Sequence, residues 1–152
     1  NSILFSQLQS NGSFHNAAEI EPKSEPGKTI NTLIIDNIGM LSRLYRYADI
    51  TYVGGGFGDS GLHNILEAAV YGKPVFFGPV YENHFEAMEM EDAGGAVSIE
   101  NALELESELN ILWNNENLLK ERGEAAKQYI YDNAGATRQI SDYIYKNRLL
   151  TN

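Results

Sequence analysis

Cysteine is absent from the sequence, so a disulfide framework and a thiolate metal site are both excluded. No apolar run approaches the roughly 20 residues that a membrane-spanning helix needs, and the N-terminus lacks the basic-then-apolar order of a signal peptide. Basic residues are also scarce, because 11 Lys and Arg face 21 Asp and Glu for a net charge of -10. We therefore expect a soluble chain whose main partner is neither nucleic acid nor an anionic membrane surface.

The length of 152 residues and the hydrophobic fraction of 43% fit one globular domain with a real core. The chain opens at Asn1 without an initiating Met, and this start predicts that it comes from the middle of a larger protein. No internal repeat is apparent.

Short apolar runs alternate with segments of helical periodicity over the first hundred residues. Strands are predicted at residues 3–6, 32–36, 50–53, 75–79 and 96–99. Helices are predicted between them at residues 39–47, 62–71 and 82–92, and a polar loop at residues 7–28. The run at 32–36 has no alternation, which predicts a strand buried on both faces. This order indicates an α/β fold: a partial Rossmann-like parallel sheet with flanking helices.

After the last predicted strand the chain becomes wholly helical. Helices are predicted at residues 102–113, 116–132 and 137–149, with apolar faces that we expect to cover the sheet. We thus predict one truncated domain over residues 1–152, with a sheet portion at about 1–100 and a helical C-terminal tail at about 101–152.

A glycine-rich loop at Gly54, Gly55 and Gly56 joins a predicted strand to the next helix. Such a loop lets backbone N–H groups approach an anionic ligand, and ligands of parallel sheets bind beyond the carboxyl ends of strands. Glycines at this position can also serve only a turn. The loop therefore indicates a nucleotide or nucleotide-sugar site only together with its neighbours.

Three polar residues follow the loop at helical spacing: His63, Asn64 and Glu67. They share roughly one face, while the apolar residues around them complete the buried side without them. A carboxylate at Glu67 can accept two hydroxyl hydrogen bonds from a ribose. The alternative is that Glu67 merely favours the helix dipole and that Asn64 is a first-turn polar residue. We expect His63 to act through hydrogen bonds.

Two more strand-end turns carry candidate contacts, one at Gly39 and one at Asn83. Gly39 leaves room for a ligand against the free N–H groups of a helix start. Three such turns on neighbouring strands would form one cleft rim. In contrast, neither a Ser-His-Asp order nor a carboxylate pair nor a phosphate-loop lysine occurs, and no second His stands at metal-ligand spacing. We predict no catalytic residue in this chain, no metal and no cofactor.

Six ordered motifs resemble the C-terminal half of 3-deoxy-D-manno-octulosonic acid (Kdo) transferases. They are Ile-Asp-Asn-Ile-Gly-Met (35–40), Leu-Tyr-Arg-Tyr-Ala-Asp-Ile (44–50), Val-Gly-Gly-Gly (53–56), His-Asn-Ile-Leu-Glu-Ala-Ala (63–69), Gly-Lys-Pro-Val (72–75) and Phe-Gly-Pro (77–79). The resemblance runs from about Ile3 to Tyr143, and the triple glycine is similar to the Bacteroidetes branch. It implies the C-terminal half of a GT-B glycosyltransferase fold.

The resemblance also implies a function and a set of contacts. The whole enzyme would transfer Kdo from CMP-Kdo to a lipid A precursor at the cytoplasmic face of the inner membrane, in lipopolysaccharide synthesis. The donor's CMP would be held by the residues at two positions, Ile38, Gly39 and Met40 and then Asn64, Ile65, Leu66 and Glu67. Many relatives carry an acidic residue where Met40 stands, so only a backbone role carries over there.

The general base and the acceptor surface of the family belong to an N-terminal domain that this chain lacks. We therefore predict that the chain alone is inactive and binds CMP weakly, and that the unpaired edge of the 32–36 strand pairs copies of the chain. Two alternatives stay open: a GT-B transferase or an epimerase that uses a UDP-sugar, and a non-catalytic nucleotide-binding or interaction domain.

Overall fold

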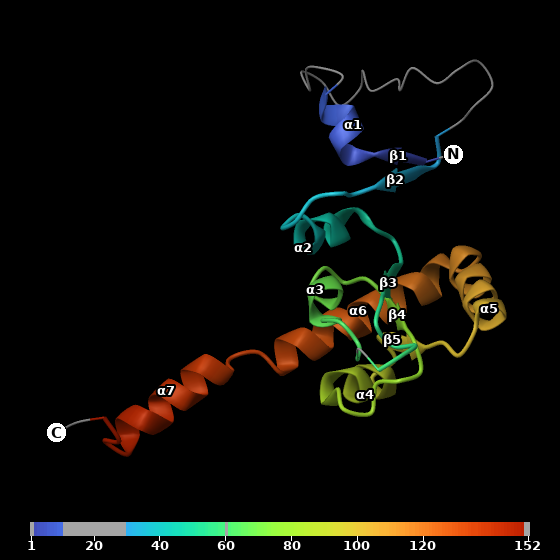
Figure 1. Cartoon of the computed structure of the whole chain (residues 1–152). Coiled ribbons are helices and arrows are strands. Elements are labelled where there is room, and N and C mark those ends of the chain that lie inside the picture. Colours follow the sequence, from blue (N-terminus) through green and yellow to red (C-terminus); the bar gives the residue numbers. More distant parts are fainter. Residues whose placement is uncertain (1, 11–29, 60, 151–152) are drawn as a thin grey trace. The chain divides into compact units, whose positions relative to one another are not determined.

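The computed structural model describes residues 2–10, 30–59 and 61–150 (Figure 1). The chain divides into two compact units, Asn1–Arg43 and Leu44–Asn152. Both units carry parallel strands with helices, as the predicted α/β class requires.

The first unit is built on two short parallel strands, β1 (Ser2–Leu4) and β2 (Thr32–Ile34). The helix α1 (Phe5–Ser10) follows β1 directly. Its residue Ser6 donates hydrogen bonds from both its backbone N and its Oγ to the carboxylate of Asp36, just beyond β2. The Ser6 side-chain bond, followed by the backbone bond, lowers the pKa of Asp36. These bonds join the two strand ends.

Several predictions for the first unit are wrong. The strand predicted at residues 3–6 ends at Leu4, and Phe5 and Ser6 begin α1. Residues 7–10 are helical rather than part of a loop, because the helix continues the apolar start of the chain; the rest of the predicted loop, residues 11–29, lies outside the described residues. The strand β2 is not buried on both faces, since Leu33 and Ile34 are 49% and 44% exposed. A two-stranded sheet with one short described helix cannot cover both of its faces.

The second unit contains a three-stranded parallel sheet in the order β3-β4-β5, namely Thr51–Val53, Val75–Phe77 and Ala96–Ser98. The strand β3 is preceded by the short helix α2 (Leu41–Leu44), which spans the boundary between the units, and by the 3-10 turn η2 (Tyr45–Tyr47). Helix α3 (Leu66–Ala69) connects β3 to β4, and α4 (Phe85–Asp92) connects β4 to β5.

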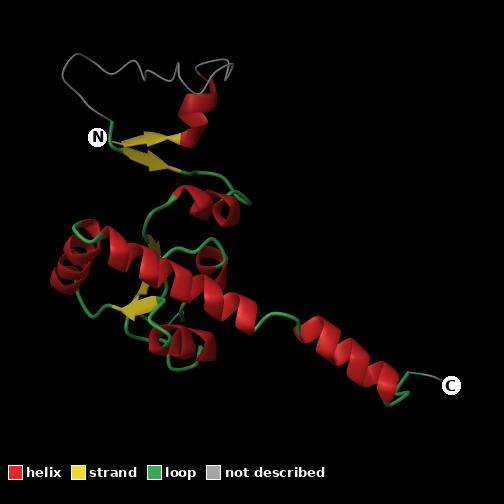
Figure 2. Ribbon diagram, turned by 180° about the vertical axis from the view of Figure 1, so that it is seen from behind, coloured by secondary structure: helices red, strands yellow, loops and turns green. Residues whose placement is uncertain are grey.

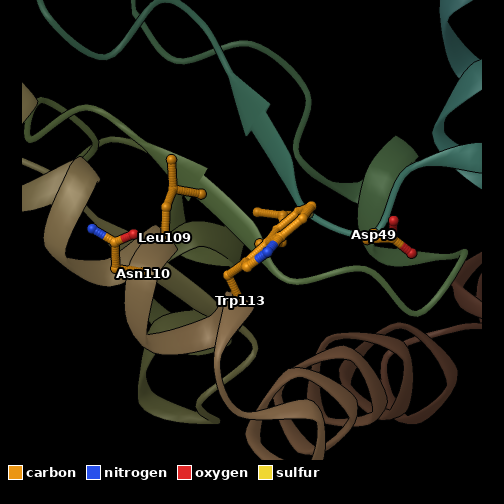
Figure 3. Close-up of a pocket in the computed structure, with 5 residues that line it drawn as sticks. Asp49, Leu109, Asn110 and Trp113 are labelled. Atoms are coloured by element: carbon orange, nitrogen blue, oxygen red, sulfur yellow. The ribbon is translucent and has the colours of Figure 1, made fainter.

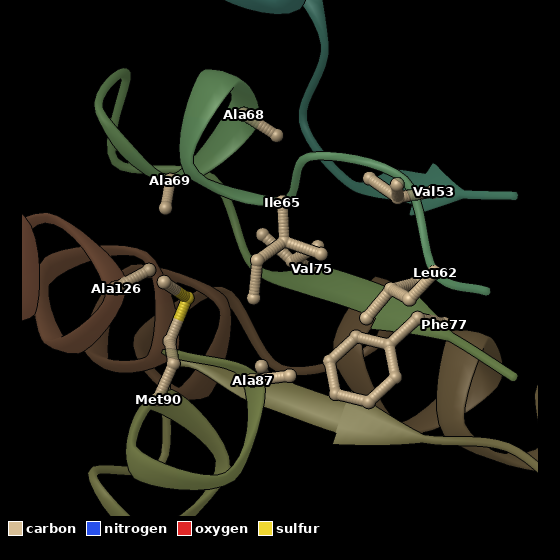
Figure 4. Close-up of a cluster of buried hydrophobic side chains, with 11 residues drawn as sticks. Val53, Leu62, Ile65, Ala68, Ala69, Val75, Phe77, Ala87, Met90 and Ala126 are labelled. Carbon is tan, nitrogen blue, oxygen red and sulfur yellow. The ribbon is translucent and has the colours of Figure 1, made fainter. Parts of the chain in front are cut away.

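Side chains alternate between the two faces of this sheet, and each face has its own apolar cluster. On one face Val53, Val75 and Phe77 pack with Ile65 of the α3 approach and Met90 of α4 (Figure 4). On the other face Phe76 packs with buried Ile99 and Leu112. Since Phe76 and Phe77 are both 0% exposed, β4 is the fully covered central strand.

Three helices follow β5: α5 (Ala102–Trp113), α6 (Glu116–Asp132) and α7 (Ala136–Lys146) (Figure 2). The first two match their predicted bounds, because each begins at an asparagine cap. Asn101 accepts hydrogen bonds from Leu103 N and Glu104 N, and Asn115 accepts one from Leu118 N. The apolar Ile140 and Tyr143 of α7 are 59% and 64% exposed, so this part of the helical tail does not cover the sheet as predicted.

Several predicted helices are shorter than expected. The helix predicted at 39–47 begins at Leu41 and becomes a 3-10 turn at Tyr45, and α7 ends at Lys146 rather than at residue 149. The segment predicted as a helix from Leu62 has no regular secondary structure up to Asn64, and α3 begins only at Leu66. The reason is that His63 N donates to Gly54 O, which ties this segment back to the preceding loop. Likewise α4 begins at Phe85 rather than at Glu82. Among the described residues, no helix has both the length and the apolar character needed to cross a membrane.

Candidate functional site

The glycine loop leaves β3 at Gly54 and folds tightly on itself. Gly55 has a φ of +100°, and a Cβ at this position would lie 2.1 Å from the carbonyl oxygen of Gly61. Only glycine can therefore occupy this point. The hydrogen bond from His63 N to Gly54 O, 3.1 Å long, closes the base of the loop.

The turn after β4 packs directly against this loop. A Cβ on Gly56 would lie 2.7 Å from three backbone atoms of Gly78, and Val80 N donates a 2.9 Å hydrogen bond to Gly56 O. Because β3 and β4 are parallel neighbours, their carboxyl ends meet at one edge of the sheet. The structure thus brings two of the three predicted strand-end turns together, backbone against backbone.

The Asn64–Glu67 pair begins the segment that leaves this junction. Asn64 Oδ1 accepts a 3.0 Å hydrogen bond from Leu66 N, and its Nδ2 donates a 3.4 Å bond to Glu67 Oε1. Between them Ile65 is 1% exposed and anchors the segment in the core, and Leu66 packs partly buried against the same core cluster. Asn64 is exposed and Glu67 half-buried, so their polar groups can reach a ligand while their backbone is fixed.

The phenol of Tyr45, in η2, interacts electrostatically with the carboxylate of Glu67. Burial, and then the negative charge of Glu67, raise the pKa of the Tyr45 phenol. The ring packs partly buried against the core cluster that holds Ile65. From the sequence, Tyr45 was assigned only to the apolar face of a predicted helix. Its polar phenol group was the one feature that could have suggested a polar neighbour such as Glu67.

The other predicted polar residues of this unit stand around the loop. His63 is exposed, and its Cδ2 lies 3.0 Å from the point where a Cβ of Gly55 would stand. Asn83 is also exposed, in the turn before α4. Their roles in binding stay predictions.

The predicted contacts Ile38, Gly39 and Met40 belong to the first unit. Gly39 has a φ of +91° with open space around it, and the Ile38 side chain is fully exposed. Asn37 Nδ2 lies 3.0 Å from the Met40 sulfur and donates to it, which holds this turn together. The exposed backbone here fits the predicted backbone role, which itself stays a prediction.

In the described ranges, no group of three or more His, Asp or Glu side chains could hold a metal ion. A separate hollow of about 500 Å³ lies beside Trp113 (Figure 3). It contributes no side chain to the glycine loop. It is lined by Asp49 and Ile50, which precede β3, so it lies at the end of that strand opposite the glycine loop. The arrangement at the glycine loop can accommodate a polar ligand.

Known proteins are similar in sequence to this chain over half or more of its length. A 3-deoxy-D-manno-octulosonic acid transferase of Bordetella pertussis is 32% identical over 144 residues, which cover 90% of this chain and 32% of the relative. Transferases of the same name from Aquifex aeolicus and Chlamydia trachomatis are 34% and 39% identical over 83 residues. This chain is homologous to part of the Kdo transferases. No protein-family model matches it.

A solved structure agrees with this relationship at the level of the fold. It is described as the C-terminal CMP-Kdo binding domain of WaaA from Acinetobacter baumannii, and it matches with a TM-score of 0.61 at 21% identity. The match covers 66% of this chain and 53% of that one. The sequence relatives, together with this agreement in fold, confirm the predicted correspondence to the C-terminal half of a Kdo transferase. The assignment to a Bacteroidetes branch stays a prediction.

The chain spans only part of its relatives. It covers 32% of the Bordetella pertussis transferase and 24% of the Aquifex aeolicus transferase. The activity of a whole Kdo transferase, with its substrates and partners, is therefore a matter for proposal.

Proposed function

We propose that this chain is the donor-binding portion of a Kdo transferase, which moves Kdo from CMP-Kdo to a lipid A precursor. The observation that carries the proposal is the junction at the carboxyl ends of β3 and β4. There the Gly56–Gly78 contact fixes two strand-end turns, and the Asn64–Glu67 pair opens beside them. The homology to Kdo transferases supports this choice of donor.

Each part of the junction has a role in this proposal. The Glu67 carboxylate accepts hydrogen bonds from the two ribose hydroxyls of CMP, and Asn64 orients it. The main chain at Ile65 and Leu66 lies alongside the nucleotide, and the glycine loop allows close approach. Its exposed neighbours His63 and Asn83 supply further hydrogen bonds.

The transfer itself needs groups that these residues do not supply. An acceptor hydroxyl attacks the anomeric carbon of Kdo, the bond from that carbon to the phosphate oxygen breaks, CMP departs, and the hydroxyl proton passes to a base. We assign the base and the acceptor surface to an N-terminal domain at the cytoplasmic face of the inner membrane. The donor phosphate is held by backbone dipoles and side chains, without a metal or a cofactor.

Calorimetric titration with nucleotides tests the binding proposal. We expect CMP to bind weakly and UMP to bind less well, and we expect the CMP affinity to be the same with and without EDTA. A preference for uridine nucleotides would favour a UDP-sugar enzyme. Absence of any nucleotide binding, in a chain that is folded by circular dichroism, would favour a non-catalytic interaction domain.

An activity assay tests whether this chain transfers Kdo without an N-terminal domain. The purified 152-residue chain is incubated with CMP-Kdo and a lipid A precursor, and Kdo transfer is followed by mass spectrometry. We expect no product, because we assign the base and the acceptor surface to an N-terminal domain. Detectable transfer would contradict this part of the proposal.

A further inference from the structure

His84 occupies a fixed point at the end of the turn after β4. Its backbone N donates a 2.8 Å hydrogen bond to Tyr81 O, and its carbonyl oxygen accepts a 2.9 Å bond from Ala87 N. The side chain is only 29% exposed, so the ring is not a freely solvated group. The main chain and the surroundings therefore hold the imidazole in one region.

The two ring nitrogens of His84 face different partners. Nδ1 lies 3.7 Å from Glu86 Oε1, within ion-pair distance. Nε2 lies 3.6 Å from the position that a Cβ on Gly61 would take, and Gly61 has a φ of +73° at which side chains are strained. The absence of a side chain there leaves the Nε2 edge beside the glycine loop. Since the Gly56–Gly78 contact fixes this loop to the turn of His84, the distance is set by backbone packing.

The charges of the two strand-end segments give this ring a particular role. Residues 54–67 and 78–86 contain four acidic residues and no Lys or Arg, so a phosphate meets no strong cation in either segment. The histidines His63 and His84 are the side chains of these segments that can become positive. Of the two, His63 is exposed, whereas His84 is partly buried and has a carboxylate beside Nδ1. One ring nitrogen faces Glu86, and the other can carry an N–H toward the loop.

We propose that His84, oriented by Glu86, is a binding residue whose Nε2–H donates a hydrogen bond to the phosphate group of a bound cytidine nucleotide. The inference rests on the proposed function and deepens it, because it names the side chain that recognises the phosphate. A charge-assisted bond of this kind distinguishes CMP from cytidine, which lacks the phosphate.

Titrations with cytidine and with CMP separate this inference from the proposed function. The variants are His84→Phe, which keeps a ring without donors, and His84→Gln, whose amide places a donor near the Nε2 position. Glu82→Gln is the matched control, an exposed side chain of the same turn. We expect His84→Phe to lose about tenfold of the preference for CMP over cytidine, with cytidine affinity unchanged. His84→Gln should keep part of the preference, and Glu82→Gln all of it.

The possible results have distinct meanings. An unchanged preference for CMP in His84→Phe would overturn the inference while the proposed function stands. Failure of the wild-type chain to bind either ligand would overturn both. Should His84→Phe fail to fold, nitrogen NMR of the wild-type imidazole decides: a shift of the His84 Nε2 signal with CMP but not with cytidine supports the inference, and no shift overturns it.

Discussion

Gly56 and Gly78 lie in backbone contact across the ends of two parallel strands. A Cβ added to Gly56 would be 2.7 Å from Gly78 N, and a Cβ added to Gly78 would be 2.4 Å from Gly56 O. Both distances are far below van der Waals contact, and the neighbouring atoms are backbone atoms that cannot rotate away. The contact therefore fixes the spacing between the glycine loop and the turn that carries Asn83 and His84.

Alanine at either glycine should destabilise the second unit. We expect Gly56→Ala and Gly78→Ala each to lower the free energy of unfolding by about 1–3 kcal/mol, because the added methyl group forces two main chains apart. Urea unfolding followed by circular dichroism measures this change. Gly58→Ala is the matched control, since the space around Gly58 is open. If all three variants were as stable as the wild-type chain, the two main chains would be able to move apart at little cost, and the prediction would be wrong.

Loss of the Asn64–Glu67 pair should weaken nucleotide binding without unfolding the chain. We expect Glu67→Gln to reduce CMP affinity about tenfold, because a neutral amide is a poorer acceptor for ribose hydroxyls than a carboxylate. Asn64→Ala should have a smaller effect, since Asn64 caps Leu66 N and only orients Glu67. Calorimetric titration measures both, with Glu82→Gln as control. An unchanged affinity in Glu67→Gln would support a purely structural role for this glutamate.

High pH should destabilise the contact between α4 and α6. Burial, and then the 2.8 Å hydrogen bond to Glu89, raise the pKa of Tyr129 to about 12. In the unfolded chain a tyrosine ionises near pH ~10, so between these values the folded state binds more protons than the unfolded one. The stabilisation is therefore complete below about pH 10 and is lost as the pH rises toward 12.

Urea unfolding at several pH values between 9 and 11, which are ~1 unit on either side of the ordinary tyrosine pKa, measures this loss. Tyr129→Phe should be less stable at neutral pH and should show a shallower decline with pH. Burial or hydrogen bonding also raises the pKa of Tyr45 and Tyr81, so some decline will remain. The variant Tyr131→Phe, at an exposed position of the same helix, is the control. An identical pH profile in wild type and Tyr129→Phe would contradict the assignment.

The strand β2 should promote association between copies of the chain. In the described part of the first unit, β2 pairs with β1 alone, and Leu33 and Ile34 are about half exposed. An apolar strand with a free edge favours pairing with another strand. We expect light scattering to show an average mass that rises with concentration, and Leu33→Lys to reduce this rise. A monomer at all concentrations would contradict the expectation.

Local patterns were sufficient for much of this fold. The helices α5 and α6 match their predicted bounds because the asparagine caps Asn101 and Asn115 act within one turn of the chain. The strands β3, β4 and β5 were recognised from short apolar runs. In β4, which is covered on both faces, successive residues are apolar. Motif order was likewise enough to indicate the Kdo transferases.

Other features needed contacts between distant segments. The helix predicted from Leu62 begins only at Leu66, because the bond from His63 N to Gly54 O competes with helix formation. The exposure of β2 could not be foreseen either, since an apolar run does not reveal what covers it. For the same reason the proximity of Tyr45 to Glu67 was missed.

The sequence by itself determined the fold class, the glycine loop and the candidate pair Asn64 and Glu67, because periodicity, glycine content and spacing are properties of neighbouring residues. Only the tertiary structure decided that Gly56 meets Gly78 and that the ring of His84 faces Gly61 and Glu86. These relationships depend on the parallel pairing of β3 with β4, which brings their carboxyl ends to one edge of the sheet. No local pattern specifies that distance.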